Sequence, residues 1–165
     1  MTSPTSLYSV DKLIEQARQL AADFKKMTGK PLPGVSNEIA EHDAAKFLGL
    51  ELSEDRSGFD AKRVLSVGPG KVQIKARTIF NNNYHGQRLG QLKLDKEWDS
   101  VVLVLMNEEY QAFEIFEATR DDVFDNLNDN SSRMKRGAMS VAKFRNIATL
   151  VWTIEDGLDA SAWRE

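Results

Sequence analysis

The fold is decided by the stretch Gly58–Thr78, which reads GFDAKRVLSVGPGKVQIKART. A Gly-Pro-Gly turn at 68–70 divides this stretch into two segments that can both form strands, which predicts an antiparallel hairpin. Because side chains alternate along a strand, the second segment has one apolar and one polar face. The apolar face carries Val72, Ile74 and Ala76, and the polar face carries Gln73, Lys75 and Arg77.

The hairpin also determines where Asp60 lies. An antiparallel return brings Asp60 toward the Lys75 end of the second strand, so a carboxylate, an amide and an ammonium group are expected to gather there. A tight turn centred near Pro69 would instead place Asp60 opposite Thr78, so a bulge or a longer loop must shift the pairing. A solvated strand face without any function gives the same alternation of residues.

Asp60, followed after twelve residues by Gln73-Ile74-Lys75, resembles the D…(E/Q)xK signature of the PD-(D/E)XK nuclease superfamily in its glutamine variant. The resemblance implies an α/β fold with a restriction endonuclease-like αβββαβ core, a mixed central sheet flanked by helices, and an extra N-terminal helix. It covers roughly residues 36–152. It also implies a DNA endonuclease that hydrolyses phosphodiesters with Mg²⁺ or Mn²⁺ as cofactor.

By the same resemblance, each residue of the motif has a role. Asp60 would be the principal metal ligand, and the Gln73 side-chain oxygen and the Ile74 carbonyl would complete the ligands from the hairpin. Lys75 would orient the attacking water and stabilise the charge that develops at phosphorus. Glutamine in place of glutamate removes one negative charge, so metal binding is expected to be weaker without a necessary loss of activity.

An acidic residue on the preceding helix is the fourth catalytic candidate. Glu38 stands eleven residues before Gly49, a spacing similar to the superfamily's E-x-x-A…L-x-x-x-G helix pattern, and would be a second metal ligand. Ala45 stands where that pattern has a larger apolar residue, so Glu41 remains a competitor. An acid near a helix N-terminus also stabilises the helix by about 0.3–1 kcal/mol and needs no catalytic role.

The distribution of charge favours a polyanionic partner, although the net charge is −3. Residues 61–94 contain seven basic and no acidic residues, and residues 130–154 contain five basic and no acidic residues. Phosphate contacts supply most non-specific affinity for nucleic acids, so DNA is the expected partner. The candidate contacts in these segments are Arg77, His85, Arg88, Lys135, Arg136 and Lys143.

Periodicity predicts the other elements. Val101–Met106 is a continuous apolar run, which indicates a central strand buried on both faces and neighbouring the 72–77 strand. The remaining expectations are helices over 10–28 and 37–48 with caps at Ser9 and Ser36, strands over 50–52 and 112–117, a short helix capped by Thr119, a helix over 140–152, and a loosely held tail after Glu155.

Length and composition suit a single domain of 165 residues, with 1–35 as an N-terminal helix and linker, 36–152 as the core and 153–165 as the tail. The absence of cysteine excludes disulfides and thiolate metal sites, and His42 and His85 lack the spacing of a zinc site. The longest aliphatic run is too short to span a membrane. A cytoplasmic protein without a membrane partner is therefore expected, and a homodimer stays open.

Two other functions remain alternatives to the nuclease. One is a catalytically inactive member of the same fold that serves as a nucleic-acid-binding or assembly module, because fold does not dictate function. The other is a protein-interaction domain whose basic face binds acidic partners. A divalent ion between Asp60 and Gln73 would favour the nuclease, whereas a separation above ~8 Å would favour the inactive module.

Overall fold

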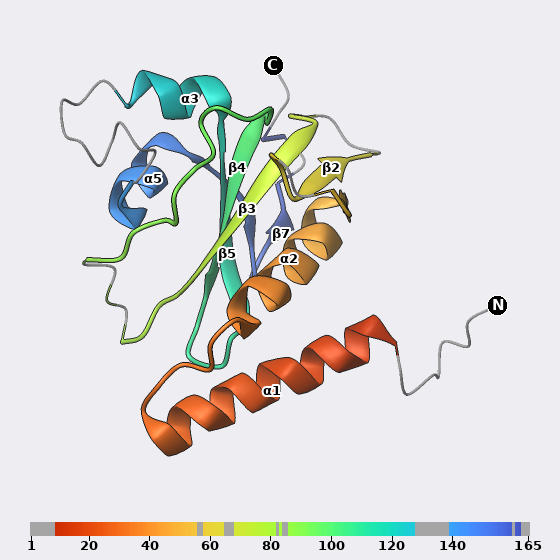
Figure 1. Cartoon of the computed structure of the whole chain (residues 1–165), viewed down its shortest axis with the longest axis vertical. Helices are drawn as coiled ribbons and strands as arrows, with labels where there is room; N and C mark the ends of the chain where they lie inside the picture. The colour runs from red at the N-terminus through yellow and green to blue at the C-terminus, as the bar shows by residue number, and fades with distance from the viewer. Residues whose placement is uncertain are drawn as a thin grey trace.

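In the computed structural model the chain forms one seven-stranded mixed sheet with helices on both faces (Figure 1). The structure describes residues 9–55, 58–64, 68–81, 83, 86–127, 139–159 and 161–162. The described elements are α1 (Val10–Thr28), α2 (Val35–Leu48), β1 (Leu50–Leu52), β2 (Ala61–Arg63), β3 (Lys71–Thr78), β4 (Ser100–Met106), β5 (Ala112–Thr119), α3 (Arg120–Asp125), α5 (Val141–Ile147), β6 (Thr149–Thr153) and β7 (Gly157–Leu158). The expectation of an α/β fold with a mixed sheet is confirmed.

Strand β4 lies in the middle of the sheet, in which the strands follow one another in chain order. All of its residues are buried, as the apolar run predicted. β4 pairs with β3 in parallel, with Gln73 beside Val101 and Lys75 beside Leu103, whereas every other neighbouring pair is antiparallel. The parallel pair requires the chain to cross over between the two strands, and residues 79–99 make this crossover.

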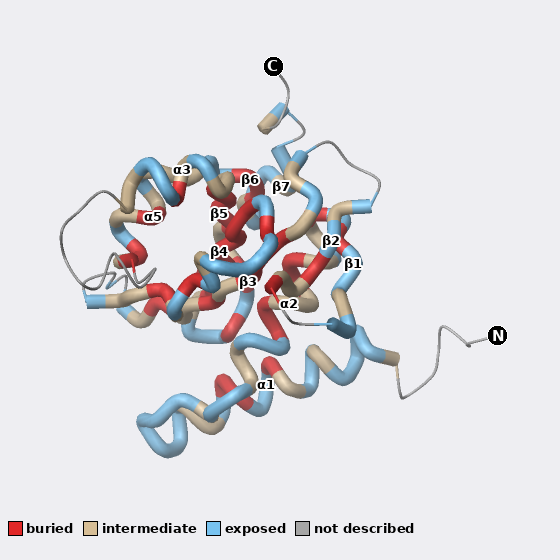
Figure 2. Tube along the Cα trace, turned by 45° about the horizontal axis from the view of Figure 1, so that its top comes forward, coloured by how far each residue is buried: buried red, intermediate tan, exposed pale blue. Residues whose placement is uncertain are grey.

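Two hydrophobic cores lie on opposite faces of the sheet. The first core is formed with α1 and α2, and its members include Ala21, Ile39, Ala44, Val72, Ile74, Ala76 and Val102. The second core is formed with the crossover, α3 and α5, and its members include Leu89, Leu92, Trp98, Val101, Leu103, Val123 and Phe144. Since Val72, Ile74 and Ala76 belong to the first core, the alternating residues of β3 face the second. Figure 2 shows the buried strands between these layers and the largely exposed outer side of α1.

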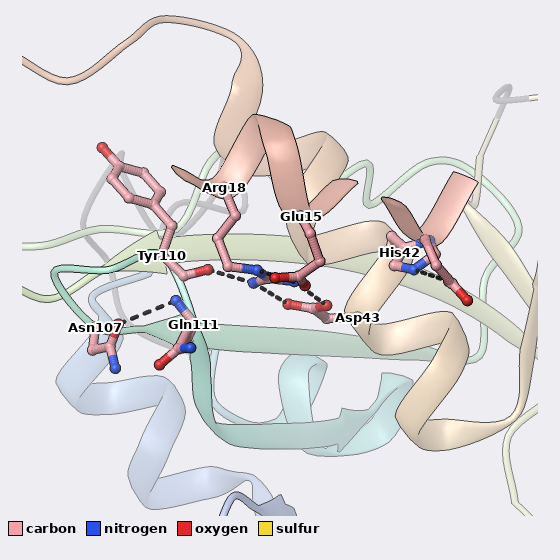
Figure 3. A network of polar contacts seen from close by, with 8 residues as sticks. Glu15, Arg18, His42, Asp43, Asn107, Tyr110 and Gln111 are labelled. Carbon is pink, nitrogen blue, oxygen red and sulfur yellow. Dashed lines mark hydrogen bonds and ion pairs between the residues drawn. The ribbon is translucent and has the colours of Figure 1, made fainter. Parts of the chain in front are cut away.

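A buried ion pair joins α1 to the first core (Figure 3). Arg18 donates two hydrogen bonds to Asp43 of α2, at 3.0 and 2.9 Å, and a third to the backbone oxygen of Tyr110. Arg18 and Asp43 are both buried. The pair therefore connects α1, α2 and the turn between β4 and β5 at one point.

The helix ends follow the predicted caps with one exception. The Ser9 side chain accepts from Lys12 N, Gly29 ends α1 with φ 74°, and Thr119 forms a capping box with Asp122, as expected. The prediction for Ser36 is wrong, because α2 begins at Val35 after Gly34, which has φ 80°. Only glycine adopts that backbone conformation readily, so Gly34 starts the helix and Ser36 lies inside its first turn.

The C-terminal part differs from its expectation. The predicted helix over 140–152 is wrong beyond Ile147, because Thr149–Thr153 forms β6 and pairs with β5. Pairing there satisfies backbone groups that β5 would otherwise leave open at its edge. The tail expectation is also wrong for residues 157–159, because Gly157–Leu158 pairs with β6 and Asp159 N donates to the backbone of Val151 at 2.8 Å.

No helix in the described part of the chain is both long and apolar enough to cross a membrane.

Candidate active site

The register of the first strands brings Asp60 beside β3. Ala61 pairs with Val72. β2 has only three residues, and the connection from β2 to β3 spans 64–70. Asp60 N donates to Val72 O at 2.8 Å, and Asp60 Oδ2 accepts a hydrogen bond from Ile74 N at 2.8 Å. The longer loop thus supplies the shift in pairing that a tight turn could not.

Lys75 occupies a half-buried position on the face of β3 that is turned to the second core. Its Nζ donates to the backbone oxygen of Gln91 in the crossover at 3.2 Å. Burial lowers the pKa of Lys75, the charge of Asp60 opposes this effect, and the charges of Lys93 and Arg77 add to it. The charge of Asp60 therefore favours the protonated form of Lys75, and the charges of Lys93 and Arg77 disfavour it.

Gln73 is almost completely buried, with 2% of its surface exposed. Its Nε2 has no hydrogen-bond partner among the described residues. A buried amide without a hydrogen-bond partner lowers the stability of the fold by about 1–3 kcal/mol, so a ligand that pairs with Gln73 would recover this loss. Rotation of the amide by half a turn exchanges its nitrogen and oxygen with little change in shape. Gln73 can therefore offer either a donor or an acceptor at this buried point.

The residues at this site fit a hard divalent cation in kind, because a carboxylate, an amide oxygen and a backbone carbonyl are all oxygen ligands. The set is small in number. Among the described residues, no group of three or more His, Cys, Asp or Glu could hold a metal ion. Asp60 is thus the single carboxylate that this part of the hairpin supplies.

Glu38 belongs to a helix on the face of the sheet opposite to that of Gln73 and Lys75. Glu38 is exposed in the first turn of α2, and α2 packs on the first core, whereas Gln73 and Lys75 face the second. Glu41 lies one turn further along the same helix and is half-buried.

One cation of the first acid-free segment is removed from the surface. Arg63 is paired with Glu117 at 2.8 and 3.3 Å, and their side chains are only 4% and 0% exposed. Ser100 Oγ donates to the same carboxylate at 2.5 Å. Burial raises the pKa of Glu117, and Arg63 and Ser100 partly oppose that rise. Arg63 therefore forms a buried ion pair and does not add to the basic surface, which the count of basic residues in the sequence could not show.

The two acid-free segments meet at the crossover. Arg88 forms a bridge with Ser140, and the neighbouring backbone groups pair from Leu89 N to Met139 O and from Val141 N to Gln87 O. Arg77 is half-buried and donates to the backbone oxygens of Arg88 and Ala76. Lys143 is half-buried in the first turn of α5, which begins after Ser140. His85, Lys135 and Arg136 lie outside the described residues.

Two features of this site were missed from the sequence. The first is the backbone carbonyl of Gln91 in the crossover, which holds Lys75. The second is the close approach of Gly58 to the crossover, where an added Cβ would lie 3.0 Å from Glu97 O. Glycines at 58 and 90 were the available signal, because a glycine outside a turn often marks a close approach of backbone or ligand.

The chain matches no protein-family model, and no curated protein matches it significantly, so the bearing of the structure on function comes from the geometry of this site.

Proposed function

We propose that this chain is a metal-dependent DNA endonuclease of the restriction endonuclease-like kind, with Asp60, Gln73 and Lys75 as its catalytic residues. The observation that carries the proposal is the 2.8 Å hydrogen bond from Ile74 N to Asp60 Oδ2. It fixes the carboxylate beside the strand on which Gln73 and Lys75 share one face. The order of α2, three antiparallel strands and a parallel β4 supports the same reading.

Each side chain has a distinct task in this proposal. Asp60, the Gln73 side-chain oxygen and the Ile74 carbonyl would hold a Mg²⁺ or Mn²⁺ ion, which would supply charge neutralisation and activate water. Lys75 donates to the phosphate oxygen on which negative charge develops. The lowered pKa of Lys75 brings the ammonium group closer to the range in which it can exchange a proton with the attacking water.

A second candidate function is a catalytically inactive module that binds nucleic acid without cutting it. The observation that favours it is the small ligand set, with one carboxylate and no group of three acidic or histidine residues in the described chain. Such a module would keep the basic residues of the crossover and lose the dependence on a metal ion.

The test is a cleavage assay with Mg²⁺ or Mn²⁺ on linear, supercoiled, methylated and single-stranded DNA. Asp60→Asn is expected to reduce cleavage by about 10²–10³-fold, the size of effect seen when one charge-stabilising group is lost. Asp99→Asn is the matched control, because Asp99 Oδ2 accepts from Lys71 N at 2.8 Å in the same manner at the start of β3. Thermal melting of both variants checks that the fold is retained.

The outcomes separate the candidates. Wild-type protein that binds DNA and never cuts it would replace the endonuclease with the inactive module. Cleavage by Asp60→Asn at the wild-type rate would place the active site elsewhere. Equal losses in Asp60→Asn and Asp99→Asn would show that the effect is structural.

A further inference from the structure

Two cations of β3 converge on one glycine of the crossover. A Cβ added to Gly90 would lie 3.6 Å from Lys75 Nζ and 3.8 Å from Arg77 Nη2. Apart from the chain neighbours of Gly90, no other atom of the described residues comes within 4 Å of that point. As far as the described residues go, the backbone of Gly90 therefore borders a space, at least the size of a methyl group, that an ammonium and a guanidinium group both face.

The crossover holds both cations without neutralising them. Lys75 Nζ donates to Gln91 O and Arg77 Nε donates to Arg88 O, so residues on either side of Gly90 fix the two side chains. Backbone carbonyls carry no formal charge, and each cation keeps further N–H donors for a ligand. Donors fixed in this way before binding lose little conformational entropy when a ligand arrives.

The local charge also favours an anion. The negative charge of Asp60 raises the pKa of Lys75, whereas the positive charges of Lys93 and Arg77 lower it. Burial lowers the pKa of both Lys75 and Arg77, which means that solvent compensates these charges only in part. An anion placed between two like charges relieves their repulsion, and guanidinium and ammonium groups are the usual partners of phosphate.

We propose that Lys75 and Arg77 hold one backbone phosphate of a nucleic acid between them, against the backbone of Gly90. Glycine is suited to this position because a side chain would occupy the place of a phosphate oxygen. The inference rests on the proposed function in that it names the group of the same substrate that the site receives. It requires no cleavage and no metal ion.

The test is the affinity of Gly90→Ala for a short fluorescent DNA, measured by anisotropy without divalent ions. The dissociation constant is expected to rise about tenfold, the equivalent of one charged hydrogen bond. The melting temperature should not change, because the added Cβ would make only ordinary contacts. Gly70→Ala is the matched control, since its Cβ would also make an ordinary contact, 3.5 Å from Asp99 Oδ2 at the other end of β3, and it should bind like wild type.

Three further experiments identify the source of the phosphate. Arg77→Ala should lower the slope of affinity against salt by about one charge, as expected for the loss of one phosphate contact. DNA with neutral methylphosphonate linkages lacks the negative charge that Lys75 and Arg77 would hold. It should therefore bind wild type and Gly90→Ala with equal affinity. Inorganic phosphate should compete with DNA in wild type and not in Gly90→Ala.

Wild-type affinity in Gly90→Ala, or equal weakening in Gly90→Ala and Gly70→Ala, would overturn the phosphate site. Binding of inorganic phosphate by a wild-type protein that binds no DNA would overturn its assignment to a nucleic acid. A wild type that never cuts, together with a weakened Gly90→Ala, would refute the endonuclease and support the phosphate site. If wild type and Gly90→Ala both cut DNA and bind it with equal affinity, the phosphate site would be refuted and the endonuclease would stand.

Discussion

Replacement of Arg63 by methionine breaks the buried ion pair with Glu117 from one side. The side chains of Arg63 and Glu117 are 4% and 0% exposed, so the pair belongs with buried salt bridges. An exposed pair contributes about 0–1 kcal/mol. Loss of one partner of a buried pair costs about 3–5 kcal/mol, because the remaining charge stays in the interior without compensation. We expect Arg63→Met to lower the free energy of unfolding by this larger amount at neutral pH.

The cost should depend on pH through Glu117. Burial raises the pKa of Glu117 above its ordinary value of 4.5, and Arg63 opposes this rise, so the pKa rises further in Arg63→Met. A group with a raised pKa in the folded state contributes stability that is complete below the unfolded pKa and is lost as pH rises through the folded pKa. The destabilisation by Arg63→Met should therefore be largest at neutral pH and should shrink as pH falls toward 4.5.

The measurement is urea unfolding at several pH values, followed by the fluorescence of the buried Trp98 and Trp152. The double variant Arg63→Met with Glu117→Gln removes the charge from both partners and should recover most of the loss. Lys71→Met is a matched surface control, because Lys71 and Glu97 are 38% and 87% exposed at a similar distance of 3.1 Å. A cost below about 1 kcal/mol for Arg63→Met, or one independent of pH, would refute the reasoning.

Three further outcomes are expected. Gly58→Ala should lower the melting temperature, because its Cβ would lie 2.9 Å from Lys96 Cβ and 3.0 Å from Glu97 O, a crowding that costs about 1–3 kcal/mol; an unchanged melting temperature would contradict this. As pH rises, DNA affinity should begin to fall before the pH reaches the ordinary lysine pKa of 10.5, because the pKa of Lys75 is lowered. Lys75→Arg should abolish that early fall in a pH series of anisotropy titrations. Gln73→Glu should strengthen Mn²⁺ binding in calorimetry by restoring a second carboxylate, and weaker binding would exclude Gln73 from the metal site.

The parts of the fold that were predicted correctly depend on local patterns. The apolar run of β4 and the period-two alternation of β3 are properties of a few adjacent residues, and any sheet that buries them must place them as observed. The same holds for the ends of α1, because Ser9 and Gly29 act on their own helix. The structure of these residues can therefore be predicted from their immediate neighbours in the sequence.

The parts that were predicted wrongly depend on distant partners. Residues 149–153 have apolar positions compatible with a helix, and they form β6 because the edge of β5 accepts them. The register of Asp60 was left open between a bulge and a longer loop, because alternation alone does not determine the length of the 64–70 connection.

The candidate site divides in the same way. The Asp60, Gln73 and Lys75 set could be proposed from one hairpin. The contribution of Gln91 could not, because the crossover meets Lys75 through tertiary packing. Arg63 was counted as a surface charge because its partner Glu117 lies in a different strand, 54 residues away.

The parallel pairing of β3 and β4 has a consequence for the order in which the chain folds. Adjacent parallel strands cannot form as a local hairpin, so the 79–99 segment must close as a loop before their contacts form. The contact between Asp60 and Ile74 needs only the β2–β3 hairpin and can form early. Lys75 and Arg77 reach Gln91 and Arg88 only when the crossover has closed. The carboxylate half of the site should therefore form on the timescale of a hairpin and the cationic half on the slower timescale of the whole sheet.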